Sequence, residues 1–289
     1  MSSEKIQKKF NLPRLAVQRF EKLHSYVKHL YPTQSELLSK ILMQLPEELS
    51  DPWIAISLIN LAPRENLLDV ILQYKIYDSR NKRETRRLNE VWVSELVYCP
   101  MRPELAKKYP ELADASVYLS PSTLLGELAH LGIRFFARAL GYETEKQIYN
   151  EITIDDERGE KLIISGRIDI FDSAKQILWD LKTGRDIVSP PSPHHALQAW
   201  FYKLLTNASE ARILYITSAR MCEVKITETH VLQALRQLGW KNAPPLSDIQ
   251  LLIKYVQWWR RKEKVPLWAW ECDYCIFSSV CPHFKRQKR

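Results

Sequence analysis

Two runs rich in Ile, Leu and aromatic residues lie close together in the middle of the chain, within Leu162 to Gly184, and the polar segment Asp172-Ser173-Ala174-Lys175 separates them. Asp and Ser side chains can hydrogen-bond their own backbone in a turn, so this pattern predicts an antiparallel β-hairpin. If the turn is centred on the polar segment, Asp169 lies nearly opposite Leu178. The hairpin is the first element that the sequence predicts.

The polar residues of this hairpin indicate its chemistry. Side chains alternate between the two faces of a strand, so Asp169, Asp180 and Lys182 should project from the same side of the sheet. Two carboxylates that close repel each other unless a divalent cation lies between them, and a nearby ammonium can hold a hydroxide or a developing oxyanion. The arrangement predicts metal-dependent phosphodiester cleavage. The alternative is a set of ordinary charged positions on the solvated face of a half-buried hairpin.

A helix is predicted over Leu119 to Gly141. Ser120 can cap its first turn, Pro121 suits the first helical position, and the glycine closes it. We expect this helix to pack beside the hairpin, where the neutral imidazole of His130 could complete a metal shell. A histidine with a purely structural role is the alternative at this position.

A second helix is predicted over Ala196 to Leu205, downstream of the hairpin. Gln198 and Tyr202 are spaced by one helical turn and therefore fall on one face of it. Such a pair also occurs in ordinary amphipathic helices, so the spacing alone assigns no function. Strands are predicted around Ile213 to Ile216 and Val224 to Ile226, which would complete a central mixed sheet.

The cysteines give independent evidence of a metal centre. Near the C-terminus the chain has a C-x2-C-x5-C pattern, and a further cysteine lies far upstream, before a proline. Four thiolates suit a zinc ion or an iron–sulfur cluster. Structural zinc usually takes two short cysteine pairs, so the one-plus-three arrangement favours a [4Fe–4S] cluster, with zinc as the alternative. The predicted ligands are Cys99, Cys272, Cys275 and Cys281, while Cys222 is expected to be a small buried apolar residue.

Taken together, these features resemble the RecB-type nucleases that carry an iron–sulfur cluster, and within them the CRISPR-associated exonucleases of the Cas-four type. The eukaryotic exonuclease-five group and the bacterial AddB-like nucleases are relatives. The PD-(D/E)xK pattern of these nucleases appears here as Gly166-Arg-Ile-Asp169 followed by Asp180-Leu-Lys-Thr-Gly184. The resemblance covers about Val91 to Phe284, roughly two-thirds of the chain.

The resemblance implies a role for each residue that matches. It assigns the ligands of a Mg²⁺ or Mn²⁺ ion to His130, Asp169, Asp180 and the backbone carbonyl of Leu181. Lys182 would position the attacking water, and Gln198 and Tyr202 would orient the DNA strand or the lysine. It also implies an exonuclease that acts on single-stranded DNA ends with 5′ to 3′ polarity and trims DNA for capture as CRISPR spacers, a step of antiviral defence. CRISPR integrase proteins are then the expected partners.

Two other functions remain open at this point. The same chemistry could serve DNA repair or recombination, because the site would be identical. A nuclease-like module could also bind nucleic acid without cutting it, but the intact Asp169, Asp180 and Lys182 argue against that.

The N-terminal part of the chain has no counterpart in the compact members of this family. Its apolar positions recur at helical spacing, for example at Leu37, Leu38, Ile41 and Leu42. We therefore expect helices over Leu15 to Leu30, Gln34 to Leu45, Trp53 to Leu61 and Arg64 to Tyr77. The charged run from Arg80 to Arg87 is interpreted as a solvated linker with few contacts. The predicted division is a helical extension, 1–85, and a nuclease domain, 86–289.

Charge and composition agree with this interpretation without establishing it. Lys and Arg outnumber Asp and Glu by 42 to 34, a balance that is compatible with a polyanionic partner. Tryptophans lie among basic residues in Tyr255 to Arg261 and in Trp268-Ala-Trp270, where they either stack single-stranded bases or pack around the cysteine cluster. The sequence has no secretory signal or long apolar run, so we expect a cytoplasmic protein without membrane contact.

The expected fold is therefore α/β. A PD-(D/E)xK, restriction-endonuclease-like core has a central mixed sheet flanked by the helices of His130 and Gln198. The iron–sulfur cluster ties the C-terminal end back to the Cys99 segment, which would make it structural because metal binding in such sites contributes folding free energy. An all-helical extension precedes this core.

Overall fold

The computed structural model describes residues 67–119, 121–155, 159–184, 189–217 and 220–284. The chain divides into two compact units, Met1–Tyr74 and Lys75–Arg289, and the features below belong to the second. The helices predicted within residues 1–61 lie outside the described residues. No helix in the described ranges is both long and apolar enough to cross a membrane.

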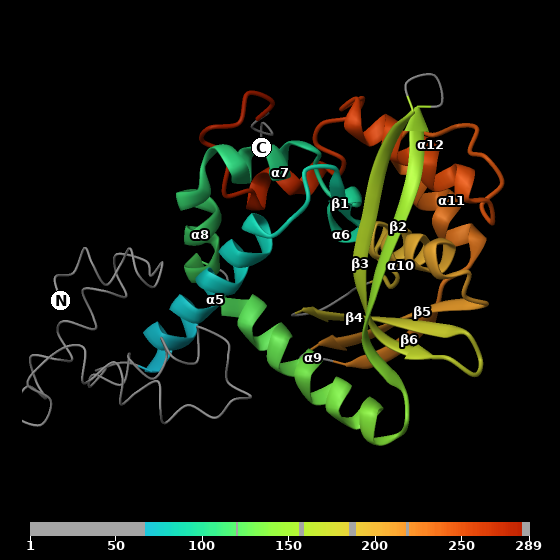
Figure 1. The fold of residues 1–289 in the computed structure, drawn as a ribbon, viewed down its shortest axis with the longest axis horizontal. Coiled ribbons are helices and arrows are strands. Elements are labelled where there is room, and N and C mark those ends of the chain that lie inside the picture. Colours follow the sequence, from blue (N-terminus) through green and yellow to red (C-terminus); the bar gives the residue numbers. More distant parts are fainter. Residues whose placement is uncertain (1–66, 120, 156–158, 185–188, 218–219, 285–289) are drawn as a thin grey trace, which may run out of the picture. The chain divides into compact units, whose positions relative to one another are not determined.

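Within the described residues, a six-stranded mixed sheet forms the centre of the second unit (Figure 1). β2 pairs antiparallel with β3 along its length, β3 with β4 and β5 with β6 are also antiparallel, and β1 with β3 and β4 with β5 are parallel. The predicted α/β fold with a central mixed sheet is confirmed. The strands are β1 (Glu90–Trp92), β2 (Glu143–Asp155), β3 (Glu160–Asp172), β4 (Ile177–Gly184), β5 (Glu210–Thr217) and β6 (Met221–Lys225).

The predicted hairpin is formed by β3 and β4, and its turn has the expected chemistry. Asp172 Oδ1 accepts hydrogen bonds from the backbone N–H groups of Ala174 and Lys175, at 3.0 and 2.9 Å. The predicted register is wrong by two residues, because Leu178 lies opposite Phe171 and not opposite Asp169. A shift of two residues leaves every side chain on its predicted face, since strand side chains alternate with a period of two.

The two predicted helices are present and cover opposite faces of the sheet. α9 (Pro121–Ala139) packs on β4 and β3, beside Ile170 and Leu181, whereas α10 (Pro193–Thr206) packs on β5 in the main core with Leu178 and Ile213. The other helices are α5 (Leu67–Glu84), α6 (Val93–Leu96), α7 (Met101–Lys108), α8 (Pro110–Leu119), α11 (Glu228–Gln237), α12 (Ile249–Arg260) and the 3₁₀ helix η2 (Ala269–Tyr274).

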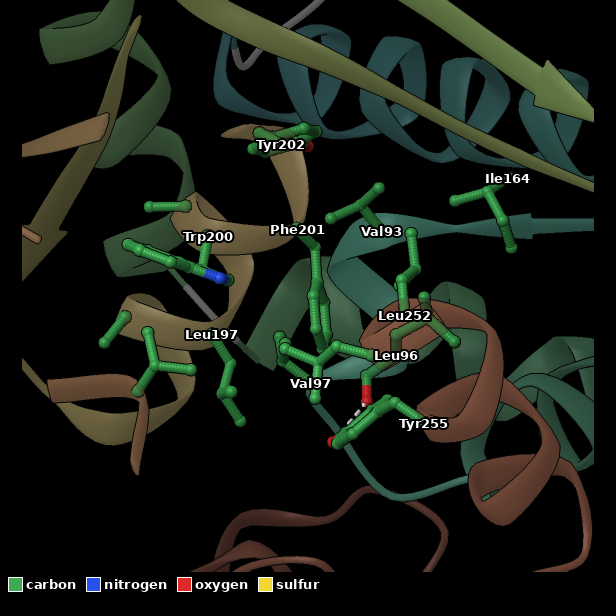
Figure 2. Close-up of a cluster of buried hydrophobic side chains, with 14 of the residues drawn as sticks. Val93, Leu96, Val97, Ile164, Leu197, Trp200, Phe201, Tyr202, Leu252 and Tyr255 are labelled. Carbon is green, nitrogen blue, oxygen red and sulfur yellow. Dashed lines mark hydrogen bonds between the residues drawn. The ribbon is translucent and has the colours of Figure 1, made fainter. Parts of the chain in front are cut away.

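The main core joins α6, α10 and α12 at one place. Figure 2 shows Leu96, Phe201 and Tyr255 among its fully buried side chains. The Tyr255 hydroxyl donates a hydrogen bond to the Leu96 carbonyl at 3.1 Å, so its polar group is satisfied inside an apolar cluster. Residues 159 positions apart are thereby held in contact.

Further hydrogen bonds connect the C-terminal part of the chain to Cys99 and the residues just before it. Trp268 Nε1–H donates to the Val97 carbonyl at 2.8 Å, and Trp259 Nε1–H donates to the Tyr98 carbonyl at 2.9 Å. The buried carboxylate of Glu271 accepts the N–H of Cys99 at 2.7 Å. The C-terminal segment is therefore fixed to the end of α6 and the residues that follow it up to Cys99 by side chains of the protein itself.

The interpretation of Arg80 to Arg87 as a solvated linker is wrong. α5 continues to Glu84, and Arg80 and Arg83 both pair with Asp114, which is 7% exposed. Arg86 pairs with Glu95 at 2.6 Å. The partners lie far along the sequence, so the charged run does not reveal them. The division at residue 85 stays a prediction, and the compact unit begins at Lys75.

Two glycines of α9 differ sharply in their surroundings. A Cβ atom on Gly126 would lie 2.5 Å from Thr183 Oγ1 of β4, while a Cβ atom on Gly132 would meet nothing within 4 Å. Gly126 therefore permits the close approach of α9 to the hairpin. Gly132 has no such role and carries the usual conformational cost of a glycine in a helix.

We expect alanine to act in opposite directions at these positions. Gly132→Ala should stabilise the fold by up to about 1 kcal/mol through helix propensity. Gly126→Ala should destabilise it by roughly 1–2 kcal/mol, because the methyl group overpacks against Thr183. Thermal melts of the full chain test this, with a difference of about 2–4 °C expected per kcal/mol.

Gly126→Ala in a Thr183→Ala background serves as the control. Removal of the Thr183 Oγ1 atom should remove most of the loss of stability that Gly126→Ala causes. A stabilising effect of Gly126→Ala equal to that of Gly132→Ala would contradict the close approach.

Candidate active site

The strands β3 and β4 pair only near their turn, and the site lies where they separate. One edge of β3 pairs with β1 at residues 163–165 and with β4 at residues 170–172. Between these two stretches, the carboxylate of Asp169 takes the place of a backbone partner. The Leu181 N–H donates to Asp169 Oδ2 at 2.9 Å. Asp169 therefore lies opposite Asp180 of β4. This pairing follows if the register of the hairpin, in which Ile170 lies opposite Trp179, continues by one residue.

α9 supplies the groups on the other side of Asp169. His130 Nδ1 lies 3.2 Å from Asp169 Oδ1, so the structure brings together the predicted histidine and the predicted aspartate. Arg134, one turn further along, lies 4.0 Å from the same oxygen and pairs with Glu145 at 2.6 Å. Burial raises the pKa of Asp169, but the His130 hydrogen bond and charge, the Leu181 N–H and the Lys182 charge outweigh it and leave the pKa below its usual value.

Asp180 and Lys182 form a buried pair on β4. Asp180 Oδ2 lies 2.8 Å from Lys182 Nζ, and Asp180 is only 4% exposed. The Lys182 ammonium therefore offsets the charge of this buried oxygen. Burial raises the pKa of Asp180 despite the Lys182 charge. Burial lowers the pKa of Lys182, but the Asp180 charge outweighs it and raises this pKa above its usual value.

α10 completes the site with both of its predicted residues. Lys182 Nζ donates to Gln198 Oε1 at 3.0 Å, so Gln198 orients the ammonium. Tyr202 lies against Gly166 of β3, where an added Cβ atom would come within 2.6 Å of the tyrosine ring. Burial raises the pKa of Tyr202 to about 12, so the phenol stays protonated at neutral pH. The glycine of the Gly-Arg-Ile-Asp sequence is thus required by the tyrosine.

The donor set fits a hard divalent cation. Two buried carboxylates face each other with an imidazole beside them, and oxygen atoms of this kind are the ligands that Mg²⁺ and Mn²⁺ prefer. Within the described residues, no three His, Cys, Asp or Glu side chains already stand as a closed metal-binding group. A bound cation would therefore require His130 or Asp169 to shift from its present contact.

Three of the four predicted cluster cysteines come together beside the Glu271–Cys99 hydrogen bond, in a region that we call the cysteine corner. Cys99, Cys275 and Cys281 belong to one small apolar cluster around Phe277, and Cys272 lies on η2. Burial raises the pKa of the Cys99 thiol to about 12. Cys222 instead lies on β6, opposite Tyr215, and packs against the main core. Thiolates are ligands of zinc and of iron–sulfur clusters, but within the described residues no three of these side chains form a metal-binding group.

Comparison with known proteins gives consistent results. A model of the PD-(D/E)XK nuclease superfamily matches residues 75–282. The chain is 32% identical over 198 residues to the CRISPR-associated exonuclease Cas4 of Saccharolobus solfataricus (strain P2), which covers 67% of this chain and 88% of that protein. The chain belongs to the Cas4 family within the PD-(D/E)XK nuclease superfamily.

The solved structures agree with this assignment. The crystal structure of SSO0001 superposes with a TM-score of 0.65 at 28% identity, over 76% of this Cas4-family chain and 98% of that chain. The family match begins at residue 75, where the compact second unit also begins. This chain is therefore a nuclease.

Sequence reasoning missed three polar residues around this Cas4-type site. Arg134 follows His130 by one turn of the same helix, a spacing that could have revealed it. Glu271 hydrogen-bonds the Cys99 backbone from far along the chain, and no local pattern indicates that contact. His194 lies among the rings of Tyr98, Trp268 and Trp270. Burial, with a smaller effect of the Lys182 charge, lowers the pKa of His194 to about 4.

The lowered pKa of His194 predicts a pH dependence of stability. Below the ordinary value of 6.5, the unfolded chain takes up a proton at this residue and the folded chain does not until about pH 4. The free energy of unfolding should therefore fall as the pH is lowered through this window. His194→Phe, which keeps a ring but cannot titrate, should make the fall shallower in urea unfolding experiments.

His283→Phe is the matched control, because His283 is exposed near the C-terminus. An equal change of slope in both variants would show that His194 is not the titrating group.

Proposed function

We propose that this Cas4-family nuclease is a metal-dependent DNA exonuclease that acts on single-stranded ends, with 5′ to 3′ polarity. The observation that carries the proposal is that the buried carboxylates of Asp169 and Asp180 face each other beside Lys182. Burying two carboxylates side by side costs free energy unless cations offset their charge. A site kept at this cost favours cleavage over the alternative of a module that only binds DNA.

The proposed metal ligands are side chains from α9, β3 and β4 and one backbone carbonyl. Mg²⁺ or Mn²⁺ bound there would polarise the scissile phosphate and lower the pKa of water. Lys182 Nζ, held by Gln198 at 3.0 Å, would orient the attacking water, and Tyr202 would fix the adjacent backbone at Gly166. The ligands are His130, Asp169, Asp180 and the carbonyl of Leu181.

A phosphodiester of the DNA strand would enter the site where β3 and β4 separate, because Asp169 and Asp180 face each other there. Lys182 remains charged at neutral pH, so its ammonium can hold the oxygen nucleophile and balance negative charge on the phosphate. This ammonium lies between Asp180 Oδ2, at 2.8 Å, and Gln198 Oε1, at 3.0 Å.

A [4Fe–4S] cluster is proposed at the cysteine corner, with Cys99, Cys272, Cys275 and Cys281 as ligands. Three of these thiols already share one apolar cluster, and the N–H of Cys99 is fixed by Glu271. The cluster would be structural, because it would close the same loop that the hydrogen bonds from Tyr255, Trp259 and Trp268 close.

The biological role proposed is the trimming of DNA before CRISPR spacer acquisition in the cytoplasm, together with integrase proteins. The support is the similarity to a protein named as a CRISPR-associated exonuclease. The same site could serve DNA repair, and a CRISPR integrase gene beside the gene of this chain would favour the first role. Copurification of the chain with integrase proteins is the corresponding biochemical observation.

Substitution of the charged trio should abolish cleavage while the protein still folds. Asp169→Ala, Asp180→Ala and Lys182→Ala each remove a metal acceptor or the water-orienting ammonium, a loss on the order of several kcal/mol in barrier height. End-labelled single-stranded DNA in Mg²⁺ or Mn²⁺ is the assay, and the position of the label reports the polarity.

Glu223→Ala, which removes a carboxylate from β6 that pairs with Arg212, is the control and should retain activity. Degradation that continues in EDTA, or in an Asp169→Ala, Asp180→Ala double variant, would overturn the proposed chemistry.

The cluster is tested by the metal content of anaerobically purified protein. We expect a brown protein with broad absorption near about 400 nm and about four irons per chain. Cys99→Ala should lose the iron, whereas Cys222→Ala should keep it, because Cys222 packs against the main core. Stoichiometric zinc without iron in the native protein would replace the cluster with a zinc site.

A further inference from the structure

The two tryptophans of the Trp268-Ala-Trp270 sequence have different roles in the structure. Trp268 is 6% exposed, and its Nε1–H donates to the Val97 carbonyl at 2.8 Å, so it is part of the core. Trp270 is 40% exposed, although it lies on η2 directly beside this core. The packing of the cysteine corner therefore accounts for Trp268 and leaves much of the Trp270 ring in contact with solvent.

Trp270 belongs to a group of three rings from distant parts of the chain. Its ring centroid lies 5.2 Å from that of His194 and 6.3 Å from that of Tyr98, and the Tyr98 and His194 centroids are 5.5 Å apart. Tyr98 precedes the Cys99 ligand position, and His194 opens α10. We call Tyr98, His194 and Trp270 the aromatic platform.

The platform adjoins the nuclease centre. Lys182 and Asp180 act electrostatically on the Tyr98 hydroxyl, and Lys182 acts on His194. α10 carries both His194 and Gln198, which holds Lys182. A DNA strand that has a phosphate at Lys182 would therefore also run past the platform.

The charges around the platform favour a polyanion that carries aromatic groups. The exposed guanidinium of Arg102 lies over the Tyr98 ring, 5.5 Å from its centroid, and supplies a cation beside the rings. Burial lowers the pKa of His194 and keeps its ring neutral at physiological pH, so His194 supports the Trp270 ring without adding charge. A phosphate could thus contact Arg102 while its base contacts the rings.

We propose that the exposed ring of Trp270, supported by Tyr98 and His194, is a stacking site for a nucleobase of the single-stranded DNA substrate, next to the nuclease centre. The inference rests on the proposed function, because it assumes that DNA is bound at Asp169 and Asp180. Every nucleobase has a π face, so such a site binds a single strand without sequence preference. Bases stacked within a duplex have no free face to offer, which gives the nuclease a physical reason to prefer single-stranded ends.

The test asks whether Trp270 contributes to DNA binding through its aromatic ring or only through its apolar volume. Binding of a fluorescent oligodeoxythymidylate to the full chain is measured by anisotropy in EDTA, so that no cleavage occurs. Trp270→Leu keeps apolar volume without a ring and should weaken binding about tenfold, as expected for one lost base–aromatic stack. Trp270→Phe should restore most of the affinity. Tyr274→Ala, in the same segment and 83% exposed, should leave it unchanged.

An oligonucleotide of abasic residues provides the decisive comparison. Trp270→Leu should not weaken the binding of the abasic strand, because that strand has no base to stack. The dependence of affinity on salt should stay the same in wild type and Trp270→Leu, since stacking releases no counterions.

The outcomes that overturn the inference are distinct. An equal loss on the two oligonucleotides would show that Trp270 only supports the fold or a protein partner, and no loss on either would remove it from the DNA path. If wild-type protein binds neither oligonucleotide, the proposed function fails and this inference fails with it. If wild type binds and cuts DNA and only the Trp270 result is negative, the proposed function stands alone.

Discussion

The carboxylate of Asp169 is the contact that brings the parts of the active site together. It accepts the Leu181 N–H of β4 and lies against His130 of α9 at the point where β3 and β4 stop pairing. A residue proposed to bind metal thus also joins two strands and a helix. Because the strands diverge here, Asp180 and Lys182 can face Asp169 without a continuous ladder of backbone hydrogen bonds between them.

A second set of contacts holds α10 and the C-terminal segment around this point. The side chains of Tyr255, Trp259 and Trp268 donate hydrogen bonds to the carbonyls of the three residues before Cys99, and the Glu271 carboxylate accepts the N–H of Cys99 itself. The Tyr98 ring in turn contacts His194 at the start of α10. The cysteine corner is thereby connected to the helix that orients Lys182. A disturbance at the cysteines can therefore reach the active site through packed side chains alone.

Much of this arrangement could be predicted because it follows from local patterns. Strand alternation placed Asp180 and Lys182 on one face, and the Asx turn at Asp172 located the hairpin. The exact register could not be predicted, since turn length is not fixed by alternation, but a two-residue error preserves the face.

Contacts between residues remote in sequence were not predictable. Arg80 and Arg83 were interpreted as solvated, yet both pair with Asp114 on another helix. Glu271 reaches Cys99 across 172 positions, and only the fold reveals that contact. The four cluster cysteines are predicted from their spacing and stay a prediction, whereas the surrounding rings come from three separate segments. Local chemistry was thus easier to predict than the framework that supports it.

The central claim is that Asp169 and Asp180 hold a divalent cation. The most direct measurement is the thermal midpoint of the metal-free full chain as Mg²⁺ is added at constant ionic strength. Wild type should gain stability with increasing Mg²⁺, by about 2.7 kcal/mol when the ion is at a hundred times its dissociation constant, while Asp180→Asn should show almost no gain. Equal gains in the two proteins, or none in wild type, would contradict the claim.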